Sequence, residues 1–313
     1  MRRSSLLLSL LLVTAAACSP AEEGGAATTT TQAGATDGFP VTVVNDLGET
    51  TIDERPESIV SLSTVATEML FAVGAGERVV AVDDQSNYPP EAPITDLSGF
   101  TPNVEAILSY EPDLVFISYD PGELAASLGA VGVPVVSFGS AFTLDDTYRQ
   151  IEAIGTITGQ AEEAATLNEQ IRTDLATVVE EAPELPEDTD YYHEVDNTLY
   201  TATSTTFIGQ VYGLFGLENI ADAADEDGSA FGFPQLSAEY IVAEDPDMIF
   251  LGNTLYGETA ETVAARPGWD VLTAVQDAHI FELDSDIVSR WGPRVVDFAQ
   301  SVADALDQYA SAG

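Results

Sequence analysis

Short runs of hydrophobic residues alternate with longer amphipathic segments from about residue 39 to the end of the chain. Four runs in the first half have the length and composition of buried strands: residues 58–62, 78–82, 113–118 and 133–138. Helical segments such as 66–73 separate these strands. This alternation predicts parallel βαβ units whose sheet is covered on both faces. A hairpin is expected ahead of them, with strands at 41–44 and 49–53.

A long helix is predicted over residues 160–181, which contain no glycine or proline. It would be roughly 33 Å long. Its hydrophobic residues are spaced by four, four and three positions and form one stripe: Leu167, Ile171, Leu175 and Val178. Two prolines end the helix, Pro183 and Pro186. Because such a helix resists a wide hinge motion, we expect a small closure around a largely preformed pocket.

A second series of alternating elements follows the long helix. Its expected strands and helices are at 191–195, 207–215, 248–251, 279–283 and 293–309. Residues 237–251 repeat residues 103–117 without a gap, and each copy contains a helix cap, a glutamate, an apolar helix, a Pro-Asp pair and a strand. A weaker match, with one gap, joins 71–80 to 212–221. The second series therefore repeats the first.

The predicted fold class is α/β, with two αβ lobes joined by one long helix and a ligand cleft between the lobes. The N-terminal lobe is expected at 39–158, the interlobe helix at 159–182 and the C-terminal lobe at 183–313. Clefts between two such bodies are common binding sites for small ligands.

The chain begins with the features of a secretory signal. Arg2 and Arg3 precede an apolar stretch at 5–17, which is shorter than the roughly 20 residues that cross a bilayer. Small residues lead to Cys18, the only cysteine. The arrangement resembles a bacterial lipobox, although Ala15 stands where leucine is commonest. The resemblance implies removal of residues 1–17 and acylation of Cys18; an ordinary secretory signal is the alternative.

Residues 18–38 are expected to form the lipidated cysteine and a flexible tether, because small and polar residues without an apolar period dominate them. Several acyl chains on one cysteine would hold the protein firmly at a membrane surface. We therefore expect an extracytoplasmic protein that its N-terminal lipid anchors to the cell membrane.

The chain is strongly acidic, with 53 aspartates and glutamates against nine basic residues, all of them arginine. A formal net charge of −44 repels nucleic acids and anionic membranes, so neither is expected as a direct partner. The single cysteine excludes an intramolecular disulfide and a multi-cysteine metal site. The acidic surface is interpreted as solvation, suited to a salty habitat.

The sequence predicts a protein that is not an enzyme and has no metal site of its own. It contains no Gly-x-Ser-x-Gly elbow, and without lysine it has no phosphate-binding Gly-x-x-x-x-Gly-Lys loop. The two histidines are His193 and His279. Because His193 and Glu194 are neighbours on a predicted strand, they should point to opposite faces and not converge on a metal.

Five segments, in their order and spacing, resemble the helix-linked class of ABC-importer substrate-binding proteins for iron–siderophores, haem and cobalamin. The resemblance covers about residues 39–311. The segments are Ser58 to Ser63 with Thr67 and Glu68, Ser86 to Pro90, Val104 and Glu105 through Leu114, Glu218 to Ile220, and Ser289 to Arg294.

The resemblance implies a role as the binding component of an importer. The ligand would be a metal chelate (a ferric siderophore, haem or cobalamin), and no other cofactor besides the lipid is expected. The partners would be an ABC permease dimer with its cytoplasmic ATPase, and the binding protein itself is expected to be a monomer. A lipid-anchored sensory or interaction module that is not coupled to an importer is the alternative.

Glu105 and Glu239 occupy equivalent places in the two copies of the repeat. Asn103 and Ser237 precede them as N-cap residues, and an acid in the first turn complements the helix dipole. The resemblance implies a further role, in which one glutamate on each lobe pairs with arginines of the permease and orients the complex.

Candidate ligand-binding residues follow the ends of the predicted strands, where open α/β sheets bind ligands. They are Ser63, Thr64, Tyr88, Phe100 and Tyr119 in the first lobe and Phe233, Asp286, Arg290 and Trp291 in the second. The aromatic side chains suit a macrocycle or a catechol ring. The alternatives are core packing for Phe100 and Tyr119 and a packed turn for Tyr88.

The candidates agree only partly with the pattern of cobalamin binders. Asp286, Arg290 and Phe233 match pocket positions of those proteins, whereas Gln85, Gly99 and Ser118 stand where they carry aromatic residues. Arg290 would supply a charge for an anionic chelate or a carboxylate, or form a surface ion pair. Arg294 is expected to be structural, because it follows Pro293 at the start of the last helix.

Overall fold

The computed structural model describes residues 38–312, which all belong to one compact unit, Ala35–Gly313. The predicted signal peptide (1–17), Cys18 and the tether up to residue 37 lie outside the described residues. Between residues 38 and 312, none of the helices combines the length and the hydrophobicity that a membrane crossing requires.

The N-terminal lobe has the predicted parallel sheet, in the order β4-β3-β5-β6. Its strands are β3 (Ile59–Leu62), β4 (Val79–Val82), β5 (Leu114–Ile117) and β6 (Val135–Ser137). The expected antiparallel hairpin of β1 (Val41–Asn45) and β2 (Gly48–Ile52) precedes them. Helices α1 (Thr64–Ala72), α2 (Val104–Leu108), α3 (Leu124–Gly129) and α4 (Leu144–Thr158) complete the lobe.

The C-terminal lobe repeats this topology, because its sheet has the equivalent order β8-β7-β9-β10. The strands are β7 (Asp190–Glu194), β8 (Glu218–Asn219), β9 (Met248–Leu251) and β10 (Ile280–Glu282). The helices are α6 (Phe207–Gly213), α7 (Ala238–Glu244), α8 (Ala260–Ala264), α9 (Thr273–Gln276), α10 (Ser285–Ser289) and α11 (Val295–Ala312). The prediction of two similar parallel-sheet lobes is confirmed.

The Pro-Asp pair of the sequence repeat has the same structural task in both lobes. The Asp113 carboxylate accepts a hydrogen bond from the Ser58 amide (3.1 Å), just before β3. The equivalent Asp247 carboxylate accepts one from the amide of Asp190 (3.1 Å), at the start of β7. Each aspartate therefore fixes the start of its own strand (β5 or β9) against the start of the neighbouring strand (β3 or β7).

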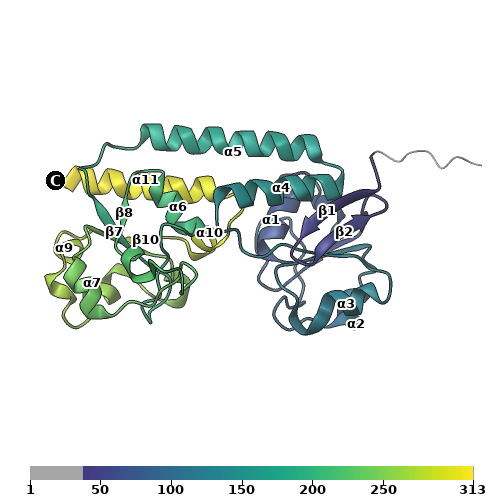
Figure 1. The fold of residues 1–313 in the computed structure, drawn as a ribbon, viewed down its shortest axis with the longest axis horizontal. Helices are drawn as coiled ribbons and strands as arrows, with labels where there is room; N and C mark the ends of the chain where they lie inside the picture. The colour runs from purple at the N-terminus through teal and green to yellow at the C-terminus, as the bar shows by residue number, and fades with distance from the viewer. Residues whose placement is uncertain (1–37, 313) are drawn as a thin grey trace, which may run out of the picture. The chain divides into compact units, whose positions relative to one another are not determined.

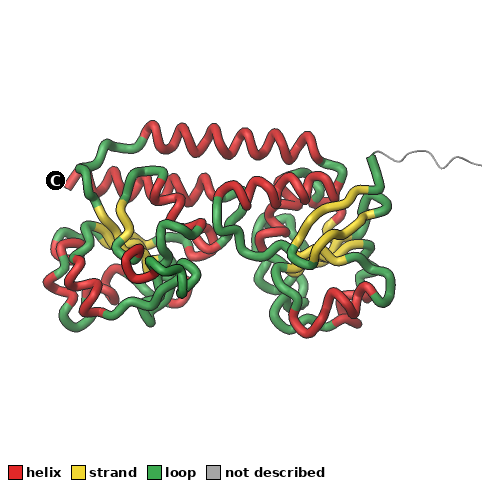
Figure 2. The backbone as a smooth tube through the Cα atoms, viewed as in Figure 1, coloured by secondary structure: helices red, strands yellow, loops and turns green. Residues whose placement is uncertain are grey.

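Helix α5 (Ala161–Glu181) is the predicted long helix, and it packs against both α4 and α11. Figures 1 and 2 show α11 and α4 one after the other in a row, with α5 lying along both of them, on one side of the two sheets. Ile171, Leu175 and Val178 of the predicted stripe are buried, and Leu167 is half-buried against the same core. The sequence predicts one connecting helix, whereas the structure has a layer of three helices.

Three hydrophobic clusters stabilise the two lobes. The largest cluster is continuous beneath the helix layer. It includes Leu114 and Phe116 of β5 as well as Met248 and Phe250 of β9. The alternate residues of these strands belong to a separate cluster in each lobe. Because successive side chains on a strand point to opposite faces, each sheet shares one core with the other lobe and has one of its own.

His193 and Glu194 lie on opposite faces of β7, as expected. His193 Nδ1 is 2.9 Å from the Tyr212 hydroxyl in the shared core, whereas Glu194 binds Arg266 on the other face. Burial lowers the pKa of His193 to about 3, so the imidazole is neutral in the folded protein at neutral pH.

Replacing His193 with glutamine should change how the stability of the protein depends on pH. Between about pH 3 and about pH 6.5, the wild-type histidine binds a proton in the unfolded chain but not in the folded protein. Its contribution to stability is therefore present above about pH 6.5 and is lost as the pH falls. We compare the unfolding free energy of His193→Gln with that of the wild type. As the pH falls from about 6 to 4, the difference should shift in favour of the variant by about 1.4 kcal/mol per pH unit. Urea unfolding at several pH values measures it, and a constant difference would contradict it.

Candidate ligand cleft

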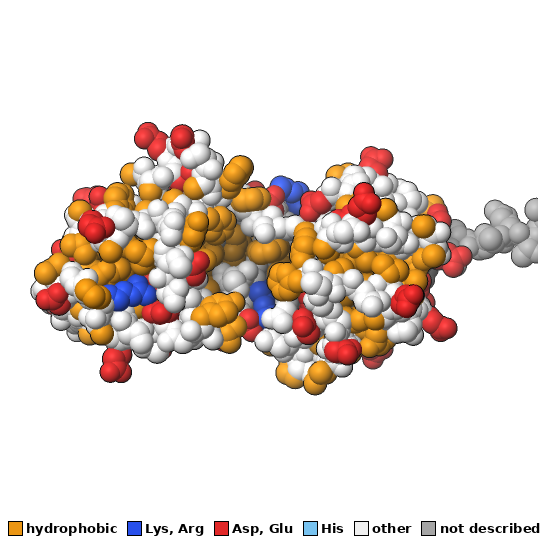
Figure 3. Space-filling view, turned by 90° about the horizontal axis from the view of Figure 1, so that it is seen from below, with side chains coloured by type: hydrophobic (Ala, Val, Ile, Leu, Met, Phe, Trp, Pro, Cys, Tyr) orange, Lys and Arg blue, Asp and Glu red, His pale blue; other side chains and the backbone are white. Residues whose placement is uncertain are grey.

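Large aromatic side chains are exposed on loops that follow the carboxyl ends of strands in both lobes. In the N-terminal lobe they are Phe100, Tyr119 and Phe142, and in the C-terminal lobe Tyr200, Phe231, Phe233 and Tyr256. Figure 3 shows hydrophobic side chains on both sides of the hollow between the lobes. Because exposed apolar surface on a soluble domain often marks an interaction site, these loops form a candidate binding surface.

Phe100 and Tyr119 form an aromatic pair in the loops beyond the carboxyl ends of the N-terminal sheet's strands. Their ring centroids are 6.2 Å apart, and the side chains are 68% and 43% exposed. The core-packing alternative therefore does not describe them. Two flat rings open to solvent can contact a planar or macrocyclic ligand with little loss of conformational entropy.

The structure explains one departure from the cobalamin pattern. A Cβ atom on Gly99 would lie 2.9 Å from the carbonyl oxygen of Leu62 and 2.8 Å from Oδ2 of the buried Asp83. No aromatic side chain fits there without a shift of the backbone. The adjacent residue, Phe100, supplies the exposed ring instead, and Tyr119 does so next to Ser118.

A buried ion cluster joins the two lobes beside these loops, and Glu68 of α1 is at its centre. Arg290 Nη1 donates to Glu68 Oε1 (2.9 Å). Arg294 binds the same carboxylate through Nε to Oε2 (2.9 Å) and Nη2 to Oε1 (2.6 Å). Two of the segments that carry the family resemblance, Thr67-Glu68 and Ser289 to Arg294, are therefore in direct contact.

Arg290 is 6% exposed, and its guanidinium is occupied by protein groups. Besides Glu68 it contacts Asn87 Oδ1 (2.8 Å), the Gln85 carbonyl (3.2 Å) and Asp286 Oδ1 (2.9 Å). Asn87 Nδ2 also donates to Asp286 Oδ2 (2.7 Å). Arg290 is therefore neither in a surface ion pair nor a free charge at the cleft. It contacts the N-terminal lobe through Glu68, Asn87 and Gln85.

Tyr88 is 42% exposed, and its ring lies against Arg294, whose guanidinium carbon is 4.4 Å from the ring centroid. It lines a pocket of about 490 Å³ together with Phe71, Glu91 and Pro293. Arg294 is structural, as expected, because its guanidinium is hydrogen-bonded to the buried Glu68. Tyr88 therefore lies at the edge of the ion cluster.

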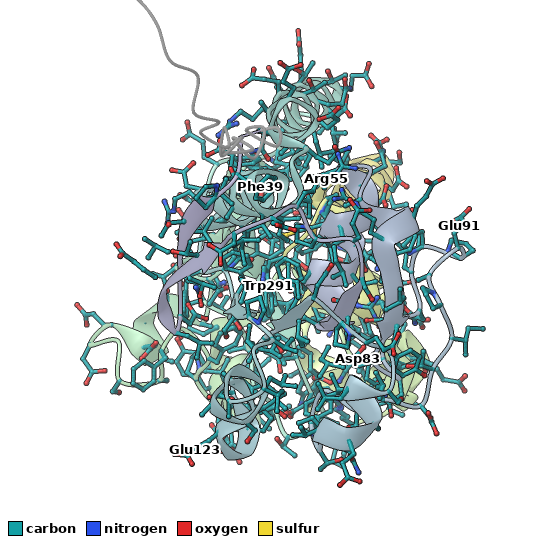
Figure 4. The ribbon with its side chains drawn as sticks, turned by 90° about the vertical axis from the view of Figure 1, so that its right-hand side faces the viewer. Phe39, Arg55, Asp83, Glu91, Glu123 and Trp291 are labelled. Atoms are coloured by element: carbon teal, nitrogen blue, oxygen red, sulfur yellow. The ribbon has the colours of Figure 1, made fainter. Side chains whose placement is uncertain are left out.

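The remaining predicted residues are less exposed. Ser63 is buried and caps α1 by accepting a hydrogen bond from the Ala66 amide, and Thr64 is the half-buried first residue of that helix. Trp291 is half-buried against the shared core and lies centrally in Figure 4. Its backbone carbonyl accepts a hydrogen bond from Thr147 Oγ1 (3.3 Å). The roles of these three residues in ligand binding stay predictions.

Sequence reasoning missed a second buried ion cluster, in the C-terminal lobe. Arg266 Nη2 donates to Glu194 Oε1 (2.7 Å) and Glu258 Oε2 (2.9 Å), and Asn253 Nδ2 donates to Glu194 Oε1 (2.9 Å). The sequence did contain a signal for this cluster, because Glu194 is a charged residue at the end of the buried strand β7. It also missed the exposed rings of Phe231 and Tyr256, which lie in loops without a recognisable pattern.

Glu105 and Glu239 are exposed at the second position of α2 and α7. Asn103 caps α2 through the Ala106 amide (3.0 Å), and Ser237 caps α7 through the Tyr240 amide (3.1 Å). In the part of the chain that the structure describes, neither glutamate is in an ion pair. Both carboxylates are therefore available to a partner.

Comparison with known proteins gives a consistent result. A family model described as periplasmic binding protein matches residues 59–287. The uncharacterized ABC transporter substrate-binding lipoprotein YvrC of Bacillus subtilis is 31% identical over 87% of this chain and 87% of its own. A cobalamin-binding protein of Halobacterium salinarum is 31% identical over 86% of this chain and 74% of its own. The apo periplasmic heme-binding protein RhuT from Roseiflexus has a TM-score of 0.70 at 26% identity, over 82% and 99% of the two chains.

The chain belongs to the periplasmic binding protein family, whose members here include ABC transporter substrate-binding proteins. Its fold is that of the helix-linked class, with two parallel-sheet lobes and a long helix across them.

Replacing Glu68 with glutamine should destabilise the protein strongly. The variant leaves Arg290 and Arg294 buried without their shared countercharge, and breaking a buried pair in this way costs about 3 kcal/mol or more. The unfolding free energy from urea denaturation measures the loss. Glu91→Gln is the matched control, because Glu91 is an exposed carboxylate that lines the same pocket, and it should change stability by less than about 0.5 kcal/mol. Equal effects of the two variants would show that the cluster does not stabilise the fold.

Proposed function

We propose that this protein is the lipid-anchored, extracytoplasmic binding component of an ABC importer for a metal chelate. The observation that carries the proposal is the set of exposed aromatic side chains on strand-end loops of both lobes. Such surfaces contact large, flat ligands well. Named relatives bind cobalamin or haem, which supports a ferric siderophore, haem or cobalamin as the ligand class.

The cleft is proposed to be largely preformed. Helix α5 packs against helices of both lobes, and Glu68 is hydrogen-bonded to two arginines of the opposite lobe. A wide opening would break these buried contacts, so ligand entry involves only a small displacement of the lobes. The aromatic loops then contact the chelate, and the protein binds the chelate without converting it chemically.

Delivery is proposed to occur by docking of both lobes onto a dimeric permease, which a cytoplasmic ATPase drives. Glu105 and Glu239 are at equivalent positions of the two lobes, exposed and fixed at capped helix starts. Two equivalent acidic groups suit a two-fold partner that carries basic residues, since complementary charges set orientation and association rate.

The anchor is proposed to be a lipid on Cys18, followed by the tether that ends near residue 38. The relative from Bacillus subtilis is named a lipoprotein, which supports this assignment. Confinement to the membrane surface raises the effective concentration of the binding protein at its permease. A single copy offers both glutamates, so the proposed unit is a monomer.

Reversing both docking charges should separate ligand binding from import. The double variant Glu105→Arg with Glu239→Arg should bind the chelate as the wild type does and reduce uptake of the radiolabelled chelate by about tenfold or more. The variant Phe100→Ala with Tyr119→Ala should instead weaken binding itself, measured by calorimetry.

Glu163→Arg is the matched control for the docking charges, because Glu163 is an exposed glutamate on α5. It should leave both binding and uptake unchanged. Chelate binding in a cell that shows no uptake dependent on this protein would favour the lipid-anchored sensory module.

Replacing Cys18 with serine should release the protein from the membrane. The variant has no thiol for acylation, so it should lose incorporation of a labelled fatty acid and move from the membrane to the soluble fraction. Ser19→Ala is the control and should stay in the membrane fraction. A Cys18→Ser protein that remains in the membrane fraction would show that another feature anchors it.

A further inference from the structure

The positive charges of the described chain are all bound by protein groups. The sequence has no lysine, and seven of its nine arginines lie between residues 38 and 312. Six of these seven form ion pairs with aspartate or glutamate. The seventh, Arg78, is buried and donates to the carbonyl oxygens of Pro56 and Thr158.

Arg290 is the arginine that the sequence offers for an anionic ligand, yet its hydrogen bonds are already made. Its two terminal nitrogens contact Glu68, Asn87, Gln85 and Asp286. A ligand carboxylate or catecholate would have to displace one of these acceptors, and displacement of Glu68 or Asp286 would leave that carboxylate without its partner. The two histidines are buried, so they offer no positive charge at the surface of the cleft.

The field around the cleft is negative. The chain carries 53 acidic residues, and the exposed Asp84 and Asp120 lie in the loops that follow β4 and β5. Each negative charge on a ligand would be repelled by this field, most strongly at low salt. A neutral ligand avoids the repulsion, and a cation gains attraction both from the field and from exposed aromatic faces.

We infer that the chelate bound in this cleft has no net negative charge. The inference rests on the proposed function and narrows its ligand class. A neutral iron(III) tris-hydroxamate, its cationic amine derivative or a cobalt corrinoid without a net negative charge fits the cleft. An iron(III) tris-catecholate, which carries three negative charges, does not fit it, and neither does haem with its two ionised propionates.

The test compares chelates of different charge on the mature, lipidated protein, purified in mild detergent. Isothermal titration calorimetry is run with an iron(III) tris-hydroxamate, its cationic amine derivative, cyanocobalamin, an iron(III) tris-catecholate and haem. At least one of the three uncharged or cationic probes should bind about 100-fold more tightly than either anionic probe. An anionic probe that binds as tightly as the best of these three overturns the inference and leaves the importer proposal standing. Failure of all five probes to bind overturns both.

A variant tests whether charge causes the selectivity. Asp286→Asn removes one negative charge and one countercharge of Arg290, so the ratio of tris-catecholate to tris-hydroxamate affinity should rise by about tenfold. Glu163→Gln removes a charge on the exposed face of α5 and should leave the ratio unchanged. Circular dichroism establishes that both variants fold. An unchanged ratio in folded Asp286→Asn overturns the electrostatic basis of the inference.

Discussion

The buried carboxylate of Glu68 links the two lobes and helps to fix how they face each other. It accepts hydrogen bonds from two arginines of the opposite lobe, Arg290 and Arg294. A charge buried in this way is stable only while its partners stay in place, so the interlobe geometry is held by electrostatics as well as by packing. The same contacts occupy both terminal nitrogens of Arg290, so the proposed ligand would meet mainly the exposed aromatic side chains. The cluster around Glu68 thus bears on both the geometry between the lobes and the proposed charge preference of the cleft.

The internal repeat connects the fold with the proposed docking. In both lobes a capped helix presents a glutamate outward, a residue with positive φ (Glu111 or Asp245) precedes the proline, and an aspartate holds the next strand. Since the local hydrogen bonds correspond, the two glutamates are fixed in corresponding ways on their own sheets. A two-fold partner can therefore use one recognition geometry twice.

Strands, the long helix and the repeat were predictable because local hydrophobic periodicity determines them. The same holds for the opposite orientations of His193 and Glu194, which follow from strand geometry alone. The partners of Arg290 were not predictable, because Glu68 lies more than two hundred positions away in the chain and many acids compete for any arginine. The exposed rings of Phe231 and Tyr256 were missed since loop conformation depends on contacts that no local pattern encodes. For Gly99, only the structure shows that the neighbouring Asp83 and Leu62 leave no space for a side chain.

The hydrophobic cluster that lies between the helix layer and both sheets has a consequence for how the molecule unfolds. It includes strand residues of each lobe and residues of α4, α5 and α11. Neither lobe can lose its structure without exposing apolar surface that the other lobe covers. The two lobes should therefore melt in one cooperative transition, although each has its own sheet. Ligand bound between them would raise the melting temperature of the whole described unit, including parts that the ligand does not touch.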